Sequence, residues 1–359
     1  MAPVTAYISQ PRLTVGGQVA DGLAADLLSL LVEETAEGLY RCEARFNNQG
    51  ARSGSVSFLY FGRDVVDFGQ EFAVELGPED AARQVFLGRI SALEAEYLPD
   101  SSSQVVVLAE DRLQDLRMTR RTRTFEDMSD EDIAGQIASE HSLTPDLDMR
   151  GPTHDVVAQV NQSDLAFLRQ RARAVGAEVW VEGTTLLARR RANREGEVVT
   201  LEHGVNLISL SVRADLAHQV TEVGVTGWDV GAKEPIEETA DQAAIRDELG
   251  SGTGGSAVLE DAFQARKERV VHTVPLSAEE ARGVAEARYR ERARRFLTGR
   301  GVADGDARLR VGGTVTLSSL GSLFDGDYVL VYVRHTYDLT AGYRTEFGVE
   351  RPWIGAAQQ

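Results

Sequence analysis

The stretch that decides the fold runs from Gly69 to Asp111 and reads GQEFAVELGPEDAARQVFLGRISALEAEYLPDSSSQVVVLAED. Apolar and polar residues alternate in EFAVEL and in SQVVVLAED, and the turn-forming segments LGPED and LPDSSS separate the runs. Alternation with a period of two places one face of each run in a core, and clusters of Gly, Pro, Asp and Ser end strands. The stretch therefore predicts a three-stranded antiparallel meander.

A second stretch, more than two hundred residues further on, has the same layout. The first copy contains, in order, Gly69, Phe72, Val74, Phe86, Gly88, Tyr97 and Asp111, and the second contains Gly312, Val315, Leu317, Phe324, Gly326, Tyr337 and Glu350. The interval from the second glycine to the final acid is nearly equal in the two copies. This similarity favours two copies of one β-unit over a chance match of glycine-bounded strands. A cyclic trimer of such a chain would present six similar units around one axis.

Length and composition exclude several classes of protein. The 359 residues suffice for two or three domains, and 56 acidic against 38 basic residues give a net charge of −18, which argues against a uniformly basic nucleic-acid binder. Cys42 is the single cysteine, so an internal disulfide and a cysteine-built zinc or iron–sulfur site are excluded. The N-terminus lacks a basic and an apolar signal region, and the longest apolar stretch, residues 23–32, is short and contains Asp26. We expect a soluble protein without a standard secretion signal.

Helical patterns appear after residue 116. Ser129 is placed to cap a helix that carries Ile133 and Ile137 on one face, and Ser163 is placed to cap a second helix that ends near Gly176. Two alternating runs then predict a hairpin that turns near Gly183. Residues 117–198 therefore predict a small α+β domain.

The remaining chain reads as strands with one interruption. The segment 231–299 contains an acidic stretch, the glycine-rich GSGTGGS, which predicts a flexible surface loop, and a long helix whose Ser277 and Glu280 form a capping box. The predicted fold class is β-rich α+β with several domains. We expect a first β-domain at 1–116, the α+β domain at 117–198, a discontinuous second β-domain at 199–230 plus 300–359, and the insertion at 231–299.

Three stretches resemble the phage late control gene D proteins, a family that shares its fold with the central baseplate hub of contractile phages and the hub portion of VgrG spike proteins. They are DRLQDLRMTRRTRTFEDMSDEDIAGQIASEHSL, QVNQSDLAFLRQRARAVGAEVWVEG, and GDARLRVGGTVTL continuing into FDGDYVLVYVRHTYDLTAGYRTEFGVER. The middle stretch is the most specific. The residues singled out as family or structural positions are Gly88, Asn161, Ser163, Asp164, Phe167, Leu168, Gly176, Gly312, Phe324, Gly326, Tyr328 and His335.

The resemblance implies a homotrimeric hub with two duplicated antiparallel, barrel-like tube domains per chain, which joins a hexameric inner tube to a trimeric spike. Its partners would be two further copies of the chain, the inner tube protein, the spike protein, other baseplate proteins and a tape-measure protein or cargo. No membrane contact is expected, and nucleic acid would meet the hub only in passing, along a channel that we expect to be partly acidic. The protein would assemble in the bacterial cytoplasm and become part of a phage tail or an injection-system particle. Because the sequence ends at Gln359, we expect the spike to be a separate polypeptide.

The alternative function is a tail-associated peptidoglycan hydrolase, which would need two carboxylates across a cleft. Adjacent pairs such as Glu110–Asp111 and Glu126–Asp127 are expected by composition alone. The G-x-S-x-G elbow is missing, the six histidines show no metal-ligand spacing, and Gly250, Gly252 and Gly255 lack the strand and helix context of a dinucleotide site. We therefore expect no catalytic, cofactor or metal residues. A carbohydrate-binding module would have to rely on Trp180, Trp228 and Trp353.

Arginine clusters are the remaining candidates for function. A solvated face balanced by nearby acids is the simplest interpretation, and contact with nucleic acid is another. The functional interpretation is an interface whose guanidinium groups pair with acids of a neighbouring subunit or tail protein. The candidate interface residues are Arg189, Arg190, Arg191, Arg288, Arg292 and Arg295.

Overall fold

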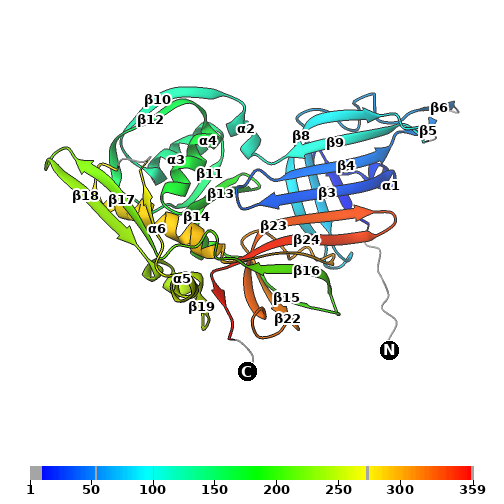
Figure 1. Cartoon of the computed structure of the whole chain (residues 1–359). Coiled ribbons are helices and arrows are strands. Elements are labelled where there is room, and N and C mark those ends of the chain that lie inside the picture. Colours follow the sequence, from blue (N-terminus) through cyan, green and yellow to red (C-terminus); the bar gives the residue numbers. More distant parts are fainter. Residues whose placement is uncertain (1–9, 53–54, 100, 272–274, 357–359) are drawn as a thin grey trace.

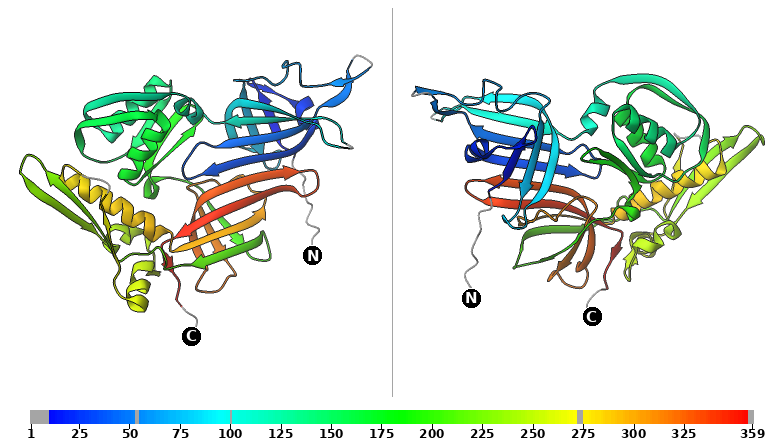
Figure 2. Two further views of the ribbon diagram at one scale, coloured as in Figure 1. Left: turned by 45° about the horizontal axis from the view of Figure 1, so that its top comes forward. Right: turned by 180° about the vertical axis from the view of Figure 1, so that it is seen from behind.

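A computed structural model describes residues 10–52, 55–99, 101–271 and 275–356. Figure 1 shows the first of two β-rich parts lying above the second, an α+β part beside the first, and an arm of strands and helices below the α+β part. The views of Figure 2 show that strands from both ends of the chain meet in the β-rich region. The expectation of a β-rich α+β protein with large antiparallel sheets is confirmed.

The first β-rich part is built from the N-terminal residues. Its elements are β1 (Arg12–Val15), β2 (Gln18–Val19), α1 (Asp21–Ala25), β3 (Leu27–Thr35), β4 (Arg41–Asn47), β7 (Glu71–Leu76), β8 (Arg83–Glu96) and β9 (Gln104–Glu110). A separate hairpin, β5 (Gln49–Arg52) and β6 (Ser55–Phe58), projects from the end of β4 (Figure 1). The predicted meander is present as β7, β8 and β9. β4 pairs with β9 on the side opposite β8.

The second β-rich part combines strands from the middle and the end of the chain. Its elements are β15 (Val198–Glu202), β16 (Leu207–Ala214), β21 (Leu297–Asp304), β22 (Thr314–Ser318), β23 (Gly326–Asp338) and β24 (Gly342–Arg351). One 13-stranded sheet unites both parts, in the order β16-β21-β24-β23-β3-β4-β9-β8-β7-β1-β2, and β22 and β15 extend it from β23.

The two parts have the same strand order. We call β3-β4-β9-β8-β7-β1 the first half-sheet and β16-β21-β24-β23-β22-β15 the second half-sheet. In the first, a bulge in β8 separates Ile90, opposite Ala109, from Ala92, opposite Leu108. In the second, a bulge in β23 separates Leu330, opposite Val349, from Tyr332, opposite Gly348. The outermost strands differ, because β1 is antiparallel to β7 whereas β15 is parallel to β22.

Two glycines occupy equivalent places in the half-sheets. Gly69 and Gly312 both have a positive φ, and each donates its N–H at 2.8 Å to the carbonyl of the residue before the bulge, Ile90 and Leu330 respectively. A positive φ suits glycine because other residues are strained there. The equivalence of Gly88 with Gly326 is wrong, however. Phe72 lies opposite Gly88 and Val315 lies opposite Tyr328, so the register matches Gly88 to Tyr328, two residues beyond Gly326.

The α+β part follows the predicted pattern. Its elements are α2 (Leu113–Arg117), β10 (Arg120–Ser129), α3 (Asp130–Glu140), β11 (Thr144–Asp148), β12 (Thr153–Ser163), α4 (Asp164–Ala174), β13 (Ala177–Glu182), β14 (Thr185–Arg190) and a 3₁₀ turn at Arg191–Asn193. Ser129 and Ser163 accept hydrogen bonds from the amides of Asp132 and Ala166, and so cap the two helices as predicted. Gly176 has φ +72° just beyond α4, which confirms it as the residue that ends the helix.

The arm packs one long helix on a small sheet. Its elements are β17 (Glu222–Asp229), β18 (Glu234–Ala240), a 3₁₀ helix at Gln242–Glu248, β19 (Thr253–Gly254), α5 (Gly255–Phe263), β20 (Lys267–Val270) and α6 (Ala278–Arg294), with β25 (Trp353–Ile354) pairing β19. We placed residues 222–229 with the second β-domain, but β17 pairs with β18 and β20 instead. Ser277 accepts from the amide of Glu280, while the Glu280 carboxylate accepts from Leu276 and not from Ser277, so the capping box is only half formed.

The glycine-rich segment is not a free surface loop. β19 within it pairs with β25, and a Cβ at Gly252 would meet the Trp353 ring at 2.1 Å. Glycine is needed here because the C-terminal strand passes directly over the backbone. The interpretation as a flexible loop is therefore wrong.

Each part has its own apolar core. Phe46 and Phe72 lie in the core of the first half-sheet, Phe167 in that of the α+β part, Phe347 in that of the second half-sheet and Tyr289 in that of the arm. Among the described residues, no helix is long and apolar enough to span a membrane.

Candidate functional site: an arginine-lined cleft and two sheet edges

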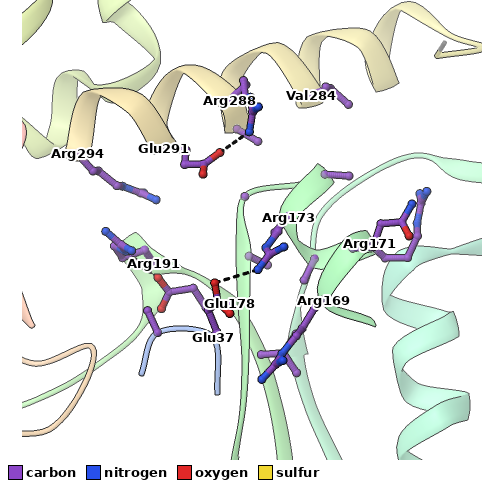
Figure 3. A pocket seen from close by; sticks show the side chains of 18 of the residues that line it. Glu37, Arg169, Arg171, Arg173, Glu178, Arg191, Val284, Arg288, Glu291 and Arg294 are labelled. Atoms are coloured by element: carbon purple, nitrogen blue, oxygen red, sulfur yellow. Dashed lines mark hydrogen bonds and ion pairs between the residues drawn. The ribbon is translucent and has the colours of Figure 1, made fainter. Parts of the chain in front are cut away.

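A cleft of about 760 Å³ lies where α4, α6 and β13 approach one another. Figure 3 shows Arg294 and Arg191 reaching toward each other from opposite sides of the cleft, with Glu37 paired to Arg173 and Glu291 paired to Arg288, whereas Arg169 and Arg171 point away from it. Its charged lining residues are Glu37, Arg169, Arg171, Arg173, Glu178, Arg191, Glu280, Arg288, Glu291, Arg294, Arg295 and Glu350. Basic groups outnumber acidic ones there, in a chain that is acidic overall.

Arg191 joins the α+β part to the second half-sheet at the bottom of this cleft. Its guanidinium donates to Glu178 at 2.7 Å and to Glu350 at 2.6 Å, and all three side chains are largely buried. Burial disfavours the charge on Arg191, but the two carboxylates outweigh this effect and raise its pKa. Removing one member of such a group would leave a buried charge without its partner, so the arrangement fixes how the two parts sit together.

The other candidate arginines have partners within the chain. Arg288 and Arg295 also line the cleft and pair with Glu291, whereas Arg292 pairs with Glu268. Arg189 donates to Asp146, and Arg190 donates to the carbonyl of Arg150. The structure thus brings together Arg191, Arg288 and Arg295, and places Arg189, Arg190 and Arg292 elsewhere. Their role as an interface with other proteins stays a prediction.

Asp164, at the start of α4, is the centre of a buried polar cluster. It accepts from Arg123 at 3.0 Å, from Gln159 at 2.9 Å and contacts His141 Nε2 at 2.9 Å. Burial opposes its ionisation, but these hydrogen bonds and the nearby arginines outweigh burial and hold its pKa below the usual range. Asp164 therefore connects the start of α4 by hydrogen bonds to β10, to β12 and to the end of α3.

Asp130, at the start of α3, has a matching environment. It accepts from Arg171 Nε at 2.5 Å and lies 3.4 Å from His154, and its pKa is also lowered against the effect of burial. Both aspartates directly follow the serine that caps their helix. The repeated Ser-Asp pair at the two helix starts is the sequence signal for this arrangement.

The C-terminal motif is organised around Arg351, which is 1% exposed. Its guanidinium lies 4.2 Å from the centroid of the Tyr328 ring and 4.0 Å from that of Trp353. It donates at 2.9 Å to three backbone carbonyls, those of Leu323, Asp325 and Trp353. Gly326 is part of this arrangement, because a Cβ there would lie 3.2 Å from both Arg351 and Trp353. Sequence reasoning found Tyr328 and Gly326 but missed Arg351.

The two half-sheets are joined where β23 pairs with β3, and we call this pairing the seam. His335 lies in the seam, on β23 opposite Val32 of β3. It is fully buried, and its Nδ1 is hydrogen-bonded to the Tyr343 hydroxyl at 2.9 Å. Burial, together with the charge of Arg310, lowers its pKa to about 3. The imidazole therefore stays neutral in the folded protein at pH values where it is protonated in the unfolded chain.

This difference predicts acid sensitivity. The native state binds fewer protons than the unfolded state between the two pKa values, so stability falls as the pH drops below about 6.5. Between the two pKa values, the free energy of unfolding falls by about 1.36 kcal/mol per pH unit. At pH 5, His335 alone should therefore lower the free energy of unfolding by about 2 kcal/mol relative to neutral pH. Urea unfolding at pH 7.5 and pH 5 should show a smaller loss for His335→Gln than for the unchanged chain. An equal loss in both would contradict this assignment.

Two more of the singled-out glycines permit close approaches. A Cβ at Gly88 would lie 2.3 Å from the carbonyl oxygen of Glu110, and one at Gly312 would lie 2.1 Å from Arg194. Arg194 in turn stacks on Trp180 at 4.1 Å and donates to the Tyr40 hydroxyl at 2.7 Å. Gly312 thereby admits a side chain of the α+β segment into the seam between the half-sheets.

The sheet presents one face without a core beneath it. Along β4, Cys42, Ala44 and Phe46 are buried, whereas Arg41 and Arg45 lie on the opposite face. That face carries cross-strand ion pairs, including Arg41–Glu33 at 2.8 Å, Arg334–Glu346 at 3.5 Å and Arg344–Asp304 at 3.2 Å. Within the part of the chain that the structure describes, no named strand pairs with the outer edge of the second part of β8 or of β16.

A family model described as the Alg8 N-terminal domain matches residues 52–338, which is most of the chain. The protein belongs to the Alg8 N-terminal domain family. The match covers β7, β8 and β9 of the first half-sheet, the α+β part, the arm and all of the second half-sheet except β24, so most residues of the cleft fall within it. Its description is not that of the late control gene D proteins, and that closer relationship stays a prediction. No curated protein matches the chain.

Solved structures share the fold of this Alg8 N-terminal domain at low sequence identity. The 43 kDa tail protein of prophage MuSo2 from Shewanella oneidensis has a TM-score of 0.70 and 14% identity, over 96% of this chain and 98% of its own. A tail protein from Neisseria meningitidis MC58 has a TM-score of 0.62 and 13% identity, over 96% and 98%. The E. coli c3393 protein, a component of the type VI secretion system, has a TM-score of 0.56 and 14% identity, over 93% and 76%. This chain thus has the fold of phage tail and type VI secretion proteins.

Of the carboxylates considered for hydrolysis, Glu110 and Asp111 make contacts within the fold. Glu110 pairs with Arg117 at 2.7 Å, and Asp111 accepts from the backbone amides of Tyr40 and Leu113. Burial raises the pKa of Asp111 to about 7. Within the described ranges, no group of three or more His, Cys, Asp or Glu side chains is arranged to hold a metal ion.

Proposed function

We propose that this protein is a structural, non-catalytic hub of a contractile tail or contractile injection system, in which three copies join a hexameric inner tube to a trimeric spike. The proposal is supported by the shared fold with phage tail and type VI secretion proteins. It places the protein in an assembled particle, after assembly in the bacterial cytoplasm, in contact with the tube, the spike and other baseplate proteins, and with a tape-measure protein or cargo.

The observation that carries the proposal is the equivalence of the half-sheets. Both contain six strands in the same order, with a bulge at the same register and a positive-φ glycine bonded to the same position. A duplicated module of this kind lets three chains present six similar sheets around one axis. A ring of six sheets matches a hexameric tube, while the α+β part and the arm, present once per chain, keep the threefold symmetry of a spike.

The uncovered sheet face would line the central channel of such a ring. It carries ion pairs of both signs, so the expected repulsion of passing DNA would come from a mixed wall and not from acids alone. Paired charges also leave few free guanidinium groups for phosphate contacts.

Native mass spectrometry of the purified chain, alone and with its tube and spike proteins, tests the proposal. We expect a trimer that binds both partners, and a reconstruction of the complex should show six similar sheets facing the tube. Monomers or dimers in the presence of both partners would refute the adaptor role. Clearing of a peptidoglycan zymogram by the purified chain would refute the non-catalytic assignment.

A further inference from the structure

The sheet of each chain ends in two edges that have no strand beside them among the described residues. β7 accompanies β8 only as far as Arg89, and beyond that point β8 pairs with β9 alone, up to Glu96. β16 pairs along its length with β21, and its one other backbone partner among the described residues is His203, which forms an isolated bridge with Leu207. These edges lie at opposite ends of the shared part of the sheet. Natural proteins protect or pair such edges because exposed backbone groups invite pairing with another chain.

The equivalent edges are already joined inside the chain. β23, the counterpart of β8, pairs antiparallel with β3, the counterpart of β16, over seven positions from Tyr332 opposite Thr35 to Asp338 opposite Ser29. The counterparts can be aligned residue by residue because each strand contains a bulge. The bulge in β3 falls between Leu27 and Ser29, and that in β16 falls between Leu207 and Ser209.

The sequences at these two bulges agree. β3 begins LLSLLV and β16 begins LISLSV, with the leucine, serine, leucine and valine positions shared. Thus Ser29 corresponds to Ser209 and Leu30 to Leu210, and on the other side Tyr332 corresponds to Ala92 and Tyr337 to Tyr97. The internal seam is therefore a template for the two open edges.

We propose that β8 of one copy, extended by Tyr97 just after its end, pairs antiparallel with β16 of the next copy, in the register that sets Tyr97 opposite Leu210, Ala95 opposite Val212 and Glu94 opposite Arg213. This inference rests on the proposed trimeric hub and specifies how its copies join. The interface is heterologous, since one edge meets a different edge, and it therefore forms a closed ring when the rotation between copies permits. Repeated three times, it makes the half-sheets of three chains continuous.

The tyrosines at equivalent places support this register. Tyr337 is 3% exposed because it packs in the seam opposite Leu30. Tyr97 is 67% exposed in the single chain, although it lies at the same distance beyond the bulge. Leu210 of a second copy would cover Tyr97 as Leu30 covers Tyr337. Burying an aromatic side chain at such a position is a common source of interface affinity.

Opposite charges face each other both in the seam and in the proposed contact, at the position next to Ala95 on β8. In the seam, Arg334 on β23 lies opposite Glu33 on β3. In the proposed contact, Glu94 on β8 lies opposite Arg213 on β16, with the signs exchanged. Both side chains are exposed, and neither forms an ion pair with any residue that the structure describes. Opposite charges facing across strands favour pairing and like charges oppose it.

Cysteine cross-linking tests the register. Ala95→Cys with Val212→Cys places two thiols on directly opposed residues of neighbouring copies, and Cys42 is buried and should remain unreacted. Mild oxidation should give covalent dimers and trimers on a non-reducing gel. The matched control, Ala95→Cys with Ala214→Cys, shifts one partner by two residues, to a diagonal separation that disfavours a disulfide. Equal cross-linking of the two pairs, or none with the first pair, would overturn the register.

Reversing the charges of Glu94 and Arg213 tests the same contact through the affinity between copies of the chain. Glu94→Arg and Arg213→Glu should each weaken trimer formation by about tenfold or more, because like charges then face each other at every interface of the ring. The double variant should recover most of the loss, measured by analytical ultracentrifugation of the full chain. Circular dichroism of the single variants separates loss of assembly from loss of fold.

The outcomes also separate the two proposals. A trimer that cross-links only in the stated register supports both. A trimer that resists cross-linking and tolerates both charge reversals overturns the β8–β16 contact and leaves the adaptor role standing. A chain that stays monomeric with tube and spike present overturns both.

Discussion

Replacing Arg351 by leucine should lower the free energy of unfolding of the second half-sheet by about 3–5 kcal/mol. The substitution leaves three backbone carbonyls, those of Leu323, Asp325 and Trp353, without their shared donor. It also removes the cation between the Tyr328 and Trp353 rings. Guanidinium unfolding followed by tryptophan fluorescence would measure the change, since Trp353 is part of the site.

Arg351→Lys is the matched control. Lysine keeps the charge, but its compact ammonium cannot reproduce the planar fork that reaches carbonyls on two segments and stacks on two rings. We expect it to recover only a minor part of the loss. Full recovery by lysine would show that charge alone matters, and a leucine variant as stable as the unchanged chain would refute the structural role of Arg351.

Phe167→Ala should destabilise the α+β part by about 3–5 kcal/mol, the usual cost of truncating a buried aromatic. Phe167 is 2% exposed and stacks on Phe125, with ring centroids 5.6 Å apart and planes 9° from parallel. The loss should be local, because the four apolar cores are distinct. Hydrogen exchange of the amides in α4 should therefore accelerate more than exchange in β3 or β4.

Val156→Ala serves as the control for this region. Val156 lies on β12 of the same α+β part but is exposed, so its truncation should change stability by no more than about 0.5 kcal/mol. A melting curve unchanged by Phe167→Ala would show that the aromatic stack contributes little. Equal effects of the two substitutions would show that burial does not govern the cost.

Local signals were sufficient to predict the elements of the α+β part. The helix-capping effects of Ser129, Ser163 and Gly176 involve backbone groups within four residues. These effects can therefore be predicted from the residues next to them in the sequence. The β-rich parts were predicted from alternation and from the spacing of glycines. The two-residue error at Gly326 arose because spacing cannot show where a ladder starts, whereas the paired register does.

The cleft and the seams could not be predicted in this way. Arg191 meets Glu350 across 159 positions of sequence, and Arg310 meets Glu34 across 276. Nothing adjacent to either arginine indicates its partner, because the contact depends on how whole sheets are placed. The glycine-rich segment was misjudged for the same reason, since the strand that covers Gly252 comes from the end of the chain.

One signal was present and unused. The similarity of LLSLLV and LISLSV lies outside the meander, so a search centred on the glycines did not reach it. With it, the repeat extends from three strands to four, and it includes both members of the internal seam.

The outermost strands of the half-sheets run differently, β1 antiparallel to β7 and β15 parallel to β22. In a closed assembly of three chains, these strands would alternate around the rim. A partner protein that contacts only the inner wall would find six nearly equivalent binding sites. A partner that contacts the outermost strands would find two different types of site, with three sites of each type. In such an assembly, the number of bound partner molecules would depend on whether the partner contacts the inner wall or the outermost strands.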